Sequence, residues 1–198
     1  MAEDSKEPRP PPRESPQRRV MARLEKDHVR IARVLENLER LLAPGNDSDI
    51  NWEIVADIIS YLQEYPDTVH HPVEDQLFDR VLDKGLTPAE RELVHTNLAQ
   101  HAEIIGATAQ LAGDIQQILN DIVVPLPQLQ NHFKHYVELQ RVHMRNEVQH
   151  LFPLAERQLG ADDWHDIAQQ MTAQADPLFE QNLDKFAALY RFITQGAA

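Results

Sequence analysis

The chain has 198 residues, and its 32 acidic side chains exceed its 19 basic side chains by 13. A chain of this length can bury the core of one domain, and its acidic balance argues against nucleic acid as a partner, since binding to phosphates needs clustered Lys and Arg. Because cysteine is absent, disulfides, iron–sulfur clusters and thiolate metal sites are excluded, so any metal must be held by nitrogen and oxygen.

Residues 1–16 differ in composition from the rest of the chain. They hold five of the 13 prolines among charged side chains, which predicts a disordered tail. They contain no apolar stretch like that of a signal peptide, and no apolar run elsewhere has the length of a membrane span. We therefore expect a soluble, cytoplasmic protein with no membrane partner.

Apolar residues recur at helical spacing through residues 17–160. The pattern predicts four helices, at about 17–43, at 51–82, from about 88 to before Pro125-Leu126-Pro127, and from after these residues to about 159. Thr87-Pro88-Ala89-Glu90 is a capping box at the start of the third helix, and Pro66 and Pro72 predict a bend within the second. Four long helices with short connections predict an all-α, up-down-up-down four-helix bundle.

Residues 161–198 are expected to form a C-terminal helical extension of this bundle domain. A short amphipathic helix is predicted near 163–174, and Asp176-Pro177 opens a last helix. The apolar side of that last helix holds Phe179, Leu183, Phe186, Tyr190 and Ile193. We expect this side to cover the bundle, with a homodimer interface through the C-terminal helices as the alternative.

Four histidines, one in each predicted helix, occupy the same level of the bundle. In antiparallel helices, two residues equidistant from the connecting turn lie at the same height. The midpoint in sequence is 49 between His28 and His70, 85.5 between His70 and His101, and 122 between His101 and His143. All three midpoints fall at or beside predicted turns. His28, His70, His101 and His143 therefore form one inward-facing layer.

Two glutamates join this layer. They lie four residues after a histidine, in His70-x-x-x-Glu74 and His143-x-x-x-Glu147, and residues at this spacing share a helix face. Six such side chains in an empty core would be very unfavourable, because uncompensated buried charge costs several kcal/mol per ion. A pair of metal ions removes this cost, and a nitrogen and oxygen donor set favours iron or manganese, with zinc as an alternative.

The ordered set His, His-x-x-x-Glu, His, His-x-x-x-Glu resembles the hemerythrin-like HHE cation-binding domains over about residues 18–160. Further elements of the resemblance are Asp27-His28, the run His70-His71-Pro72-Val73-Glu74-Asp75, and Leu151-Phe152-Pro153. The resemblance implies that two iron ions with an oxo or hydroxo bridge are the cofactor. It also implies that Glu74 and Glu147 bridge the irons and that the terminal ligands are His28, His70, His101 and His143.

The chain departs from the oxygen-carrying hemerythrins at two positions. On the expected inward stripe of the third helix, Ile105 replaces a second histidine, and Val148 stands in the fourth helix where the carriers have an aspartate. We therefore do not expect reversible oxygen carriage. His71 lies about 100° around the helix from His70, so it could complete the coordination of one iron or face a neighbouring helix or solvent.

A rival interpretation is the ferritin-like di-iron site, which is built from Glu-x-x-His motifs such as Glu25-x-x-His28 and Glu147-x-x-His150. That site also needs carboxylates at the same level of the first and third helices, where the inward positions instead hold His28 and His101. The remaining histidines are predicted to lie at the surface or around the site: His95, His132, His135 and His165.

The sequence thus predicts a non-haem di-iron protein that binds or senses O₂, NO or peroxide in a redox or nitrosative stress response, with a small diatomic molecule as its ligand. The alternative is a di-iron redox enzyme or, by resemblance to some bacterial members of the family, a factor that repairs iron–sulfur clusters of other proteins. A third hypothesis is a metal-free scaffold whose polar layer fixes the helix register.

Overall fold

The computed structural model describes residues 14–43, 50–171, 175–180 and 184–195. Within these ranges the secondary structure is helical and contains no strand, which confirms the all-α class. Most of the expected N-terminal tail, residues 1–13, lies outside the described residues. Its last residues behave differently from the prediction, because the Ser15 hydroxyl accepts from the Arg18 amide and caps a helix that begins at Pro16.

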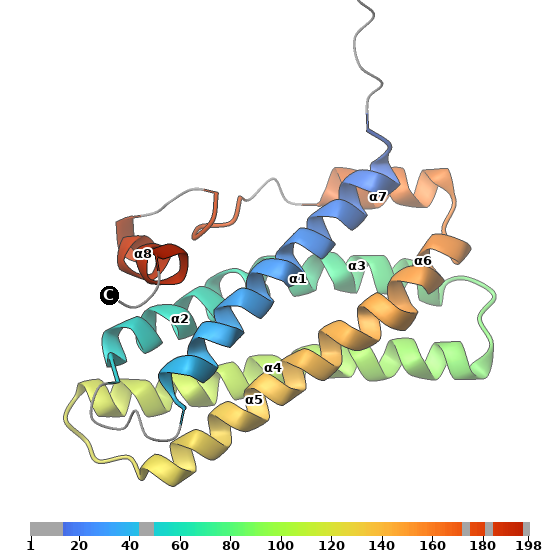
Figure 1. Ribbon diagram of the computed structural model, residues 1–198. Helices are drawn as coiled ribbons and strands as arrows, with labels where there is room; N and C mark the ends of the chain where they lie inside the picture. The colour runs from blue at the N-terminus through green and yellow to red at the C-terminus, as the bar shows by residue number, and fades with distance from the viewer. Residues whose placement is uncertain (1–13, 44–49, 172–174, 181–183, 196–198) are drawn as a thin grey trace, which may run out of the picture.

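Four helical rods lie side by side (Figure 1). The first and third rods are single helices, whereas the second and fourth are each made of two helices in line. Neighbours around the bundle are α1 and α2, α2 and α4, α4 and α5, and α5 and α1. The bounds are α1 Pro16–Leu41, α2 Trp52–Glu64, α3 His71–Leu82, α4 Pro88–Leu119, α5 Leu126–Asn146 and α6 Phe152–Gln158.

The predicted capping box begins α4. The Thr87 hydroxyl accepts from the Glu90 amide at 3.2 Å, and the Glu90 carboxylate accepts from the Thr87 amide at 2.9 Å. These two bonds satisfy amides that have no partner within the helix. The start of the third rod was therefore correctly predicted from four residues of sequence.

A five-residue π turn separates the two helices of each composite rod: Pro66–His70 joins α2 to α3, and Glu147–Leu151 joins α5 to α6. Each π turn is followed two positions later by a proline, Pro72 or Pro153. In α geometry a proline ring collides with the carbonyl four residues earlier, and a wider turn relieves this clash. The bend predicted in the second rod takes this form, and the fourth rod is interrupted in the same way although we predicted a continuous helix.

The core consists of two apolar clusters with a polar layer between them. In α1 one cluster ends at Leu24 and the other begins at Ile31, with His28 between them. The same change from one cluster to the other occurs in the second rod between Val69 and Val73. Because each rod changes cluster at the same level, the polar layer crosses the whole bundle.

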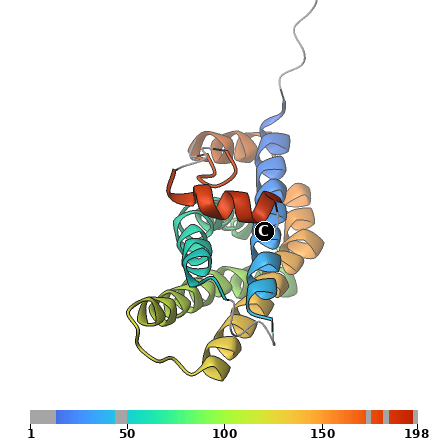
Figure 2. The ribbon, with the colours of Figure 1, turned by 60° about the vertical axis from the view of Figure 1, so that its left-hand side comes forward.

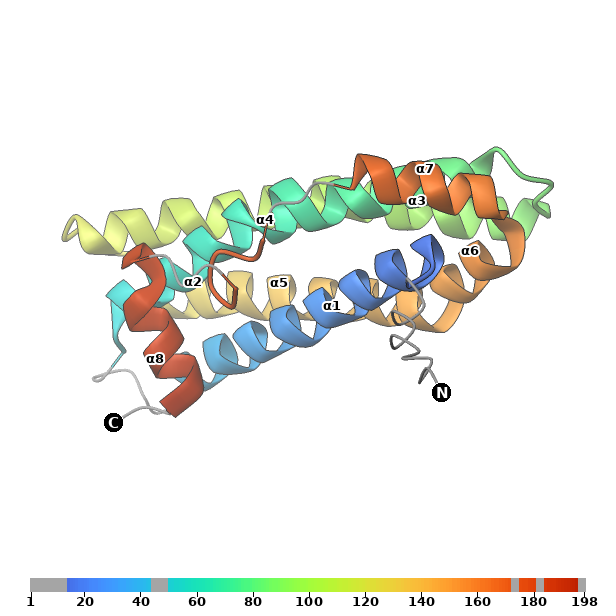
Figure 3. The same ribbon diagram turned by 90° about the horizontal axis from the view of Figure 1, so that it is seen from above.

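The two C-terminal helices cover opposite ends of the face that α1 forms with the rod of α2 and α3 (Figures 2 and 3). Helix α7 (Ala161–Gln170) packs on α1 and α3, and α8 (Ala187–Gln195) packs on α1 and α2. The expected helix at Asp176-Pro177 was wrong, since residues 177–180 form a turn and the α-helix begins only at Ala187. Tyr190 is 36% exposed and so is not part of the buried face; Leu183 lies outside the described residues.

We predict that α8 contributes to the stability of the bundle. Leu189 is fully buried, so Leu189→Ala removes core contacts and should lower the free energy of unfolding by about 2–5 kcal/mol. Leu119→Ala is the matched control, because Leu119 is 43% exposed and its truncation should cost less than about 0.5 kcal/mol. Urea denaturation followed by circular dichroism measures both values, and equal losses would show that α8 does not depend on this packing.

Candidate metal centre

The polar layer brings the four predicted histidines and the two predicted glutamates together. All six side chains are buried, and both glutamates are completely inaccessible to solvent. The Nε2 atoms of the imidazoles point toward the two carboxylates, so the six groups converge on one region. The buried members of the layer that the sequence predicted are His28, His70, Glu74, His101, His143 and Glu147.

Each glutamate lies between imidazoles from several rods. Glu74 Oε1 is 3.2 Å from Nε2 of both His28 and His70, and its Oε2 is 3.6 Å from His101 Nε2. Glu147 Oε2 is 3.2 Å from His28 Nε2, and its Oε1 is 3.2 Å from His143 Nε2. Both carboxylates therefore face donors on both sides of the layer.

The donors form two groups, and within each group all the ligand atoms lie within 4.8 Å of one another. One group consists of His28, His70 and Glu74, and the other of His71, Glu74, His101 and His143. Glu74 belongs to both groups. This arrangement has the form of two adjacent cation sites that share a carboxylate.

His71 lies in the second group, which selects between the alternatives that the sequence left open. It is 2% exposed, and its ring stacks on that of His101 with centroids 4.5 Å apart. The π turn explains how consecutive residues both face the layer, because its wider turn rotates the backbone less per residue than an α-helix does. The His71 amide donates to the Pro66 carbonyl, which is the five-residue step of a π turn.

Ile105 was wrongly predicted to face inward. Its side chain is 43% exposed, whereas Ile104 and Thr108 are buried on the inner face of α4. The expected stripe was shifted by one residue at this point. The position four residues after His101 therefore does not face the layer, and the additional imidazole comes from His71 on the neighbouring rod.

A second set of polar side chains lies behind the imidazoles. Asp75 Oδ1 is 2.6 Å from His101 Nδ1, Asp27 Oδ2 is 3.5 Å from His70 Nδ1, and Asp67 Oδ1 is 3.7 Å from His71 Nδ1. Of these three contacts, the one between Asp75 and His101 is a hydrogen bond, and in metal sites such a bond orients the imidazole so that its other nitrogen faces the ion. The sequence analysis did not assign this role to any of the three aspartates.

Asn97 is a further residue that the sequence analysis missed. Its Nδ2 donates to Glu147 Oε1 at 2.7 Å, and the side chain is 2% exposed. Asn97 lies four residues before His101, so it shares the inner face of α4. A search of that face for polar residues at this spacing would have found it.

The metal-free layer holds its charge as protonated imidazoles beside ionised carboxylates. Burial opposes charge on His28 and His70, but the facing glutamates, with Asp27 beside His70, outweigh it and raise their pKa values to about 9 and about 10. Burial alone would raise the pKa of Glu74, yet His70 and His28 hold it well below its usual range. Burial and the neighbouring imidazoles of His101 and His70 instead lower the pKa of His71 well below its usual range.

The chemistry of the donors fits a metal ion. Several buried atoms that face the layer have no hydrogen-bond partner in the described structure, among them Nε2 of His101, Nε2 of His143, and Oε2 of Glu74 and of Glu147. Unpaired buried polar atoms are unfavourable, and coordination to a cation would satisfy them. Imidazole and carboxylate together suit first-row transition metals.

The other histidines lie away from this layer. His95, His135, His150 and His165 are exposed, and His132 pairs with Asp114 at 2.7 Å between α4 and α5. The exposure of His150 removes one of the Glu-x-x-His motifs of the ferritin-like rival. The inward positions of α1 and α4 at the layer hold His28 and His101, as predicted.

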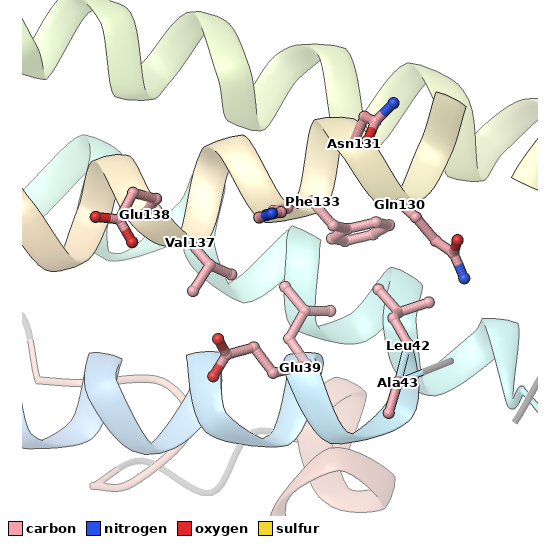
Figure 4. A pocket seen from close by; sticks show the side chains of 10 residues that line it. Glu39, Leu42, Ala43, Gln130, Asn131, Phe133, Val137 and Glu138 are labelled. Atoms are coloured by element: carbon pink, nitrogen blue, oxygen red, sulfur yellow. The ribbon is translucent and has the colours of Figure 1, made fainter. Parts of the chain in front are cut away.

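A surface groove of about 510 Å³ lies between the C-terminal part of α1 and α5 (Figure 4). None of the layer residues lines it. Its lining is mainly apolar at the base, with Glu39, Lys134 and Glu138 among its polar members. The groove is therefore separate from the buried centre.

Comparison with known families assigns the chain. The hemerythrin HHE cation binding domain matches residues 19–155, which include the four rods from α1 to the middle of α6. The chain belongs to the hemerythrin HHE cation-binding domain family, and its domain is accordingly a cation-binding one. Comparisons with curated proteins and with solved structures return no match. Among the described residues, no helix is long and apolar enough to cross a membrane.

Removal of either glutamate should reduce metal binding. Glu74→Ala or Glu147→Ala deletes a carboxylate that faces imidazoles on both sides of the layer. His132→Ala and His135→Ala are the controls, since these side chains lie outside the layer. Metal content of the purified variants, measured by plasma emission spectrometry, should fall for the glutamate variants alone. Equal content in all four would mean that the layer is not where the metal binds.

Metal affinity should rise with pH. His28 and His70, with pKa values raised to about 9 and about 10, are protonated at neutral pH, and a metal must displace those protons. Raising the pH from about 6 to about 8 lowers the cost of this displacement and tightens binding. Competition with a chromophoric chelator measures the affinity, and calorimetry in two buffers measures proton release. A pH-independent affinity without proton release would contradict the prediction.

Proposed function

We propose that this protein is a non-haem di-iron protein that binds or senses O₂, NO or peroxide in a redox or nitrosative stress response. The observation that carries the proposal is the pair of adjacent donor groups that share Glu74. A mononuclear site would have no need for five imidazoles and two carboxylates at one level. Iron fits a donor set of nitrogen and oxygen without sulfur.

In this proposal the two groups hold one ion each. His28 and His70 are terminal ligands of the first ion, and the second ion is held by His71, His101 and His143. Glu74, which is common to both groups, and Glu147, which contacts imidazoles of both groups, would hold both ions. The layer then uses seven side chains from all four rods.

The protonation states of the layer support cation binding. When neutral imidazoles replace the protonated ones, the two ionised glutamates and the aspartates behind His70 and His101 leave a negatively charged pocket. Two divalent ions compensate that charge in place of the displaced protons. The replacement also gives the unpaired atoms of His101 and His143 a partner.

The two groups differ in the number of imidazoles, and this difference supports a ligand position beside the group with fewer. An iron pair, when bound, supplies coordination of small molecules such as O₂, NO or peroxide and exchange of electrons with them. The group of His28 and His70 has one imidazole fewer than its neighbour, so an external ligand has more room there. Phe152 stacks on His28, with ring centroids 5.4 Å apart, and keeps this side apolar.

Two measurements test the proposal. Protein reconstituted with ferrous iron in the absence of oxygen should carry about two iron atoms per chain, as the two donor groups require. The reduced protein should bind NO and should be oxidised by air without releasing O₂ on evacuation, which absorption spectroscopy follows.

Three outcomes would contradict the proposal. A content of at most one metal ion per chain would refute the di-iron site, and an unreactive pair would refute the ligand-binding role. A metal ion that binds only the folded state raises thermal stability. If the thermal midpoint is unchanged after verified removal of the metal, the scaffold whose polar layer only fixes helix register is favoured instead.

A further inference from the structure

A buried path of polar side chains leads from the metal centre to the surface beside α1. The Tyr65 hydroxyl donates to the carboxylate of Asp27, with oxygen–oxygen distances of 3.1 and 3.2 Å. The same carboxylate lies 3.5 Å from Nδ1 of His70. Asp27 thus lies between Tyr65 and a proposed iron ligand: it is hydrogen-bonded to the phenol and lies within ion-pair distance of the imidazole.

The outer end of this path lies at the surface. Arg23 Nη2 donates to the Tyr65 hydroxyl at 3.1 Å, and Arg23 is part-buried. A small pocket of about 220 Å³ is lined by Ala22, Arg23, Lys26, Asp27, Tyr65 and Glu180. The Tyr65 ring itself is 1% exposed, so the phenol lies between the metal centre and this pocket.

The environment of Tyr65 suits oxidation by one electron. Burial and the Asp27 carboxylate raise the pKa of the phenol above its usual range, so the phenol stays protonated at neutral pH. Loss of an electron from a protonated phenol is favourable only when the proton leaves as well. The hydrogen bond to Asp27 provides the acceptor for that proton.

We propose that Tyr65 is a redox-active residue that donates an electron to the iron pair through Asp27 and His70. This inference rests on the proposed di-iron function. Reduction of hydrogen peroxide to two water molecules consumes two electrons and two protons. Where the bound iron pair could supply only one of these electrons, Tyr65 would supply the other; solvent would supply both protons, and the phenolic proton would pass to Asp27, which would leave a neutral tyrosyl radical.

Among the described residues, no hydrogen bond joins the other three tyrosines to a carboxylate behind the imidazoles. The Tyr61 hydroxyl donates to Asp176, which is not among the side chains behind the imidazoles, although its ring lies 6.1 Å from that of Tyr65. The Tyr136 hydroxyl accepts from Gln140 at 3.0 Å within α5. Tyr190 lies on α8 at the surface. Tyr136 is the better control, because it is as buried as Tyr65.

The experiment uses full-length protein loaded with iron, half-reduced without oxygen and mixed with hydrogen peroxide. Samples frozen within milliseconds are examined by electron paramagnetic resonance, and peroxide consumption and iron content are measured on the same samples. We expect a tyrosyl radical signal from the unchanged chain and from Tyr136→Phe. Tyr65→Phe should lose the signal while it retains its iron.

The outcomes are distinct. Iron loading and peroxide consumption without a radical, or a radical that persists in Tyr65→Phe, would overturn the role of Tyr65 and leave the proposed function standing. A chain that binds no iron pair would overturn both. Arg23→Gln removes the outer hydrogen bond and the ion pair of Arg23 with Asp27, but it keeps the phenol and its hydrogen bond to the Asp27 carboxylate. This variant should preserve the signal, and loss of the signal there would count against the proposal.

Discussion

Two carboxylates that are completely buried at the middle of a helical bundle set the conditions for the rest of this structure. Removing an ion from water costs several kcal/mol unless opposite charge and hydrogen bonds replace the lost hydration. Glu74 and Glu147 obtain that compensation from imidazoles on all four rods. The helices must therefore meet at one level and in one rotational setting, and the two apolar clusters pack on either side of that level.

The layer could be predicted from the sequence because its position depends on helix rise alone. Helices with a constant rise per residue place residues equidistant from a turn at the same height, so the loops located the level without knowledge of the packing. The same reasoning identified the partners of His70 and His143, since a spacing of four residues keeps side chains on one face. Turn and cap signals were equally local, as the capping box at Thr87 and Glu90 shows.

The direction in which a side chain faces around its helix was less predictable from the sequence than its level along the bundle. A periodicity of 3.6 residues assumes regular α geometry, and the π turns depart from it at the two motifs that carry the glutamates. His71 therefore could not be assigned to one side of its rod. Asp27 and Asp75 were missed for another reason: each lies behind a histidine of a neighbouring rod, so it is recognisable only when the rods are placed. Asp67 lies four residues before His71 on the same rod, and this spacing could have identified it from the sequence. The proline that follows each π turn is the signal in the sequence that indicates where the α geometry is interrupted.

The π turns also fix how many residues the composite rods can contain. A π turn holds about one residue more than an α turn, so deletion of one residue from Pro66–His70 would restore α geometry without turning α3 about its axis. Val73, Glu74 and Leu77 would keep their faces, but consecutive residues at the turn would again lie about 100° apart, so His70 and His71 could no longer both face the layer. Insertions and deletions in relatives should consequently be confined to the connections between rods. The number of residues in each π turn and between that turn and the layer should stay constant. The length of this domain can vary in its loops, but the spacing around Pro72 and Pro153 is part of the centre itself.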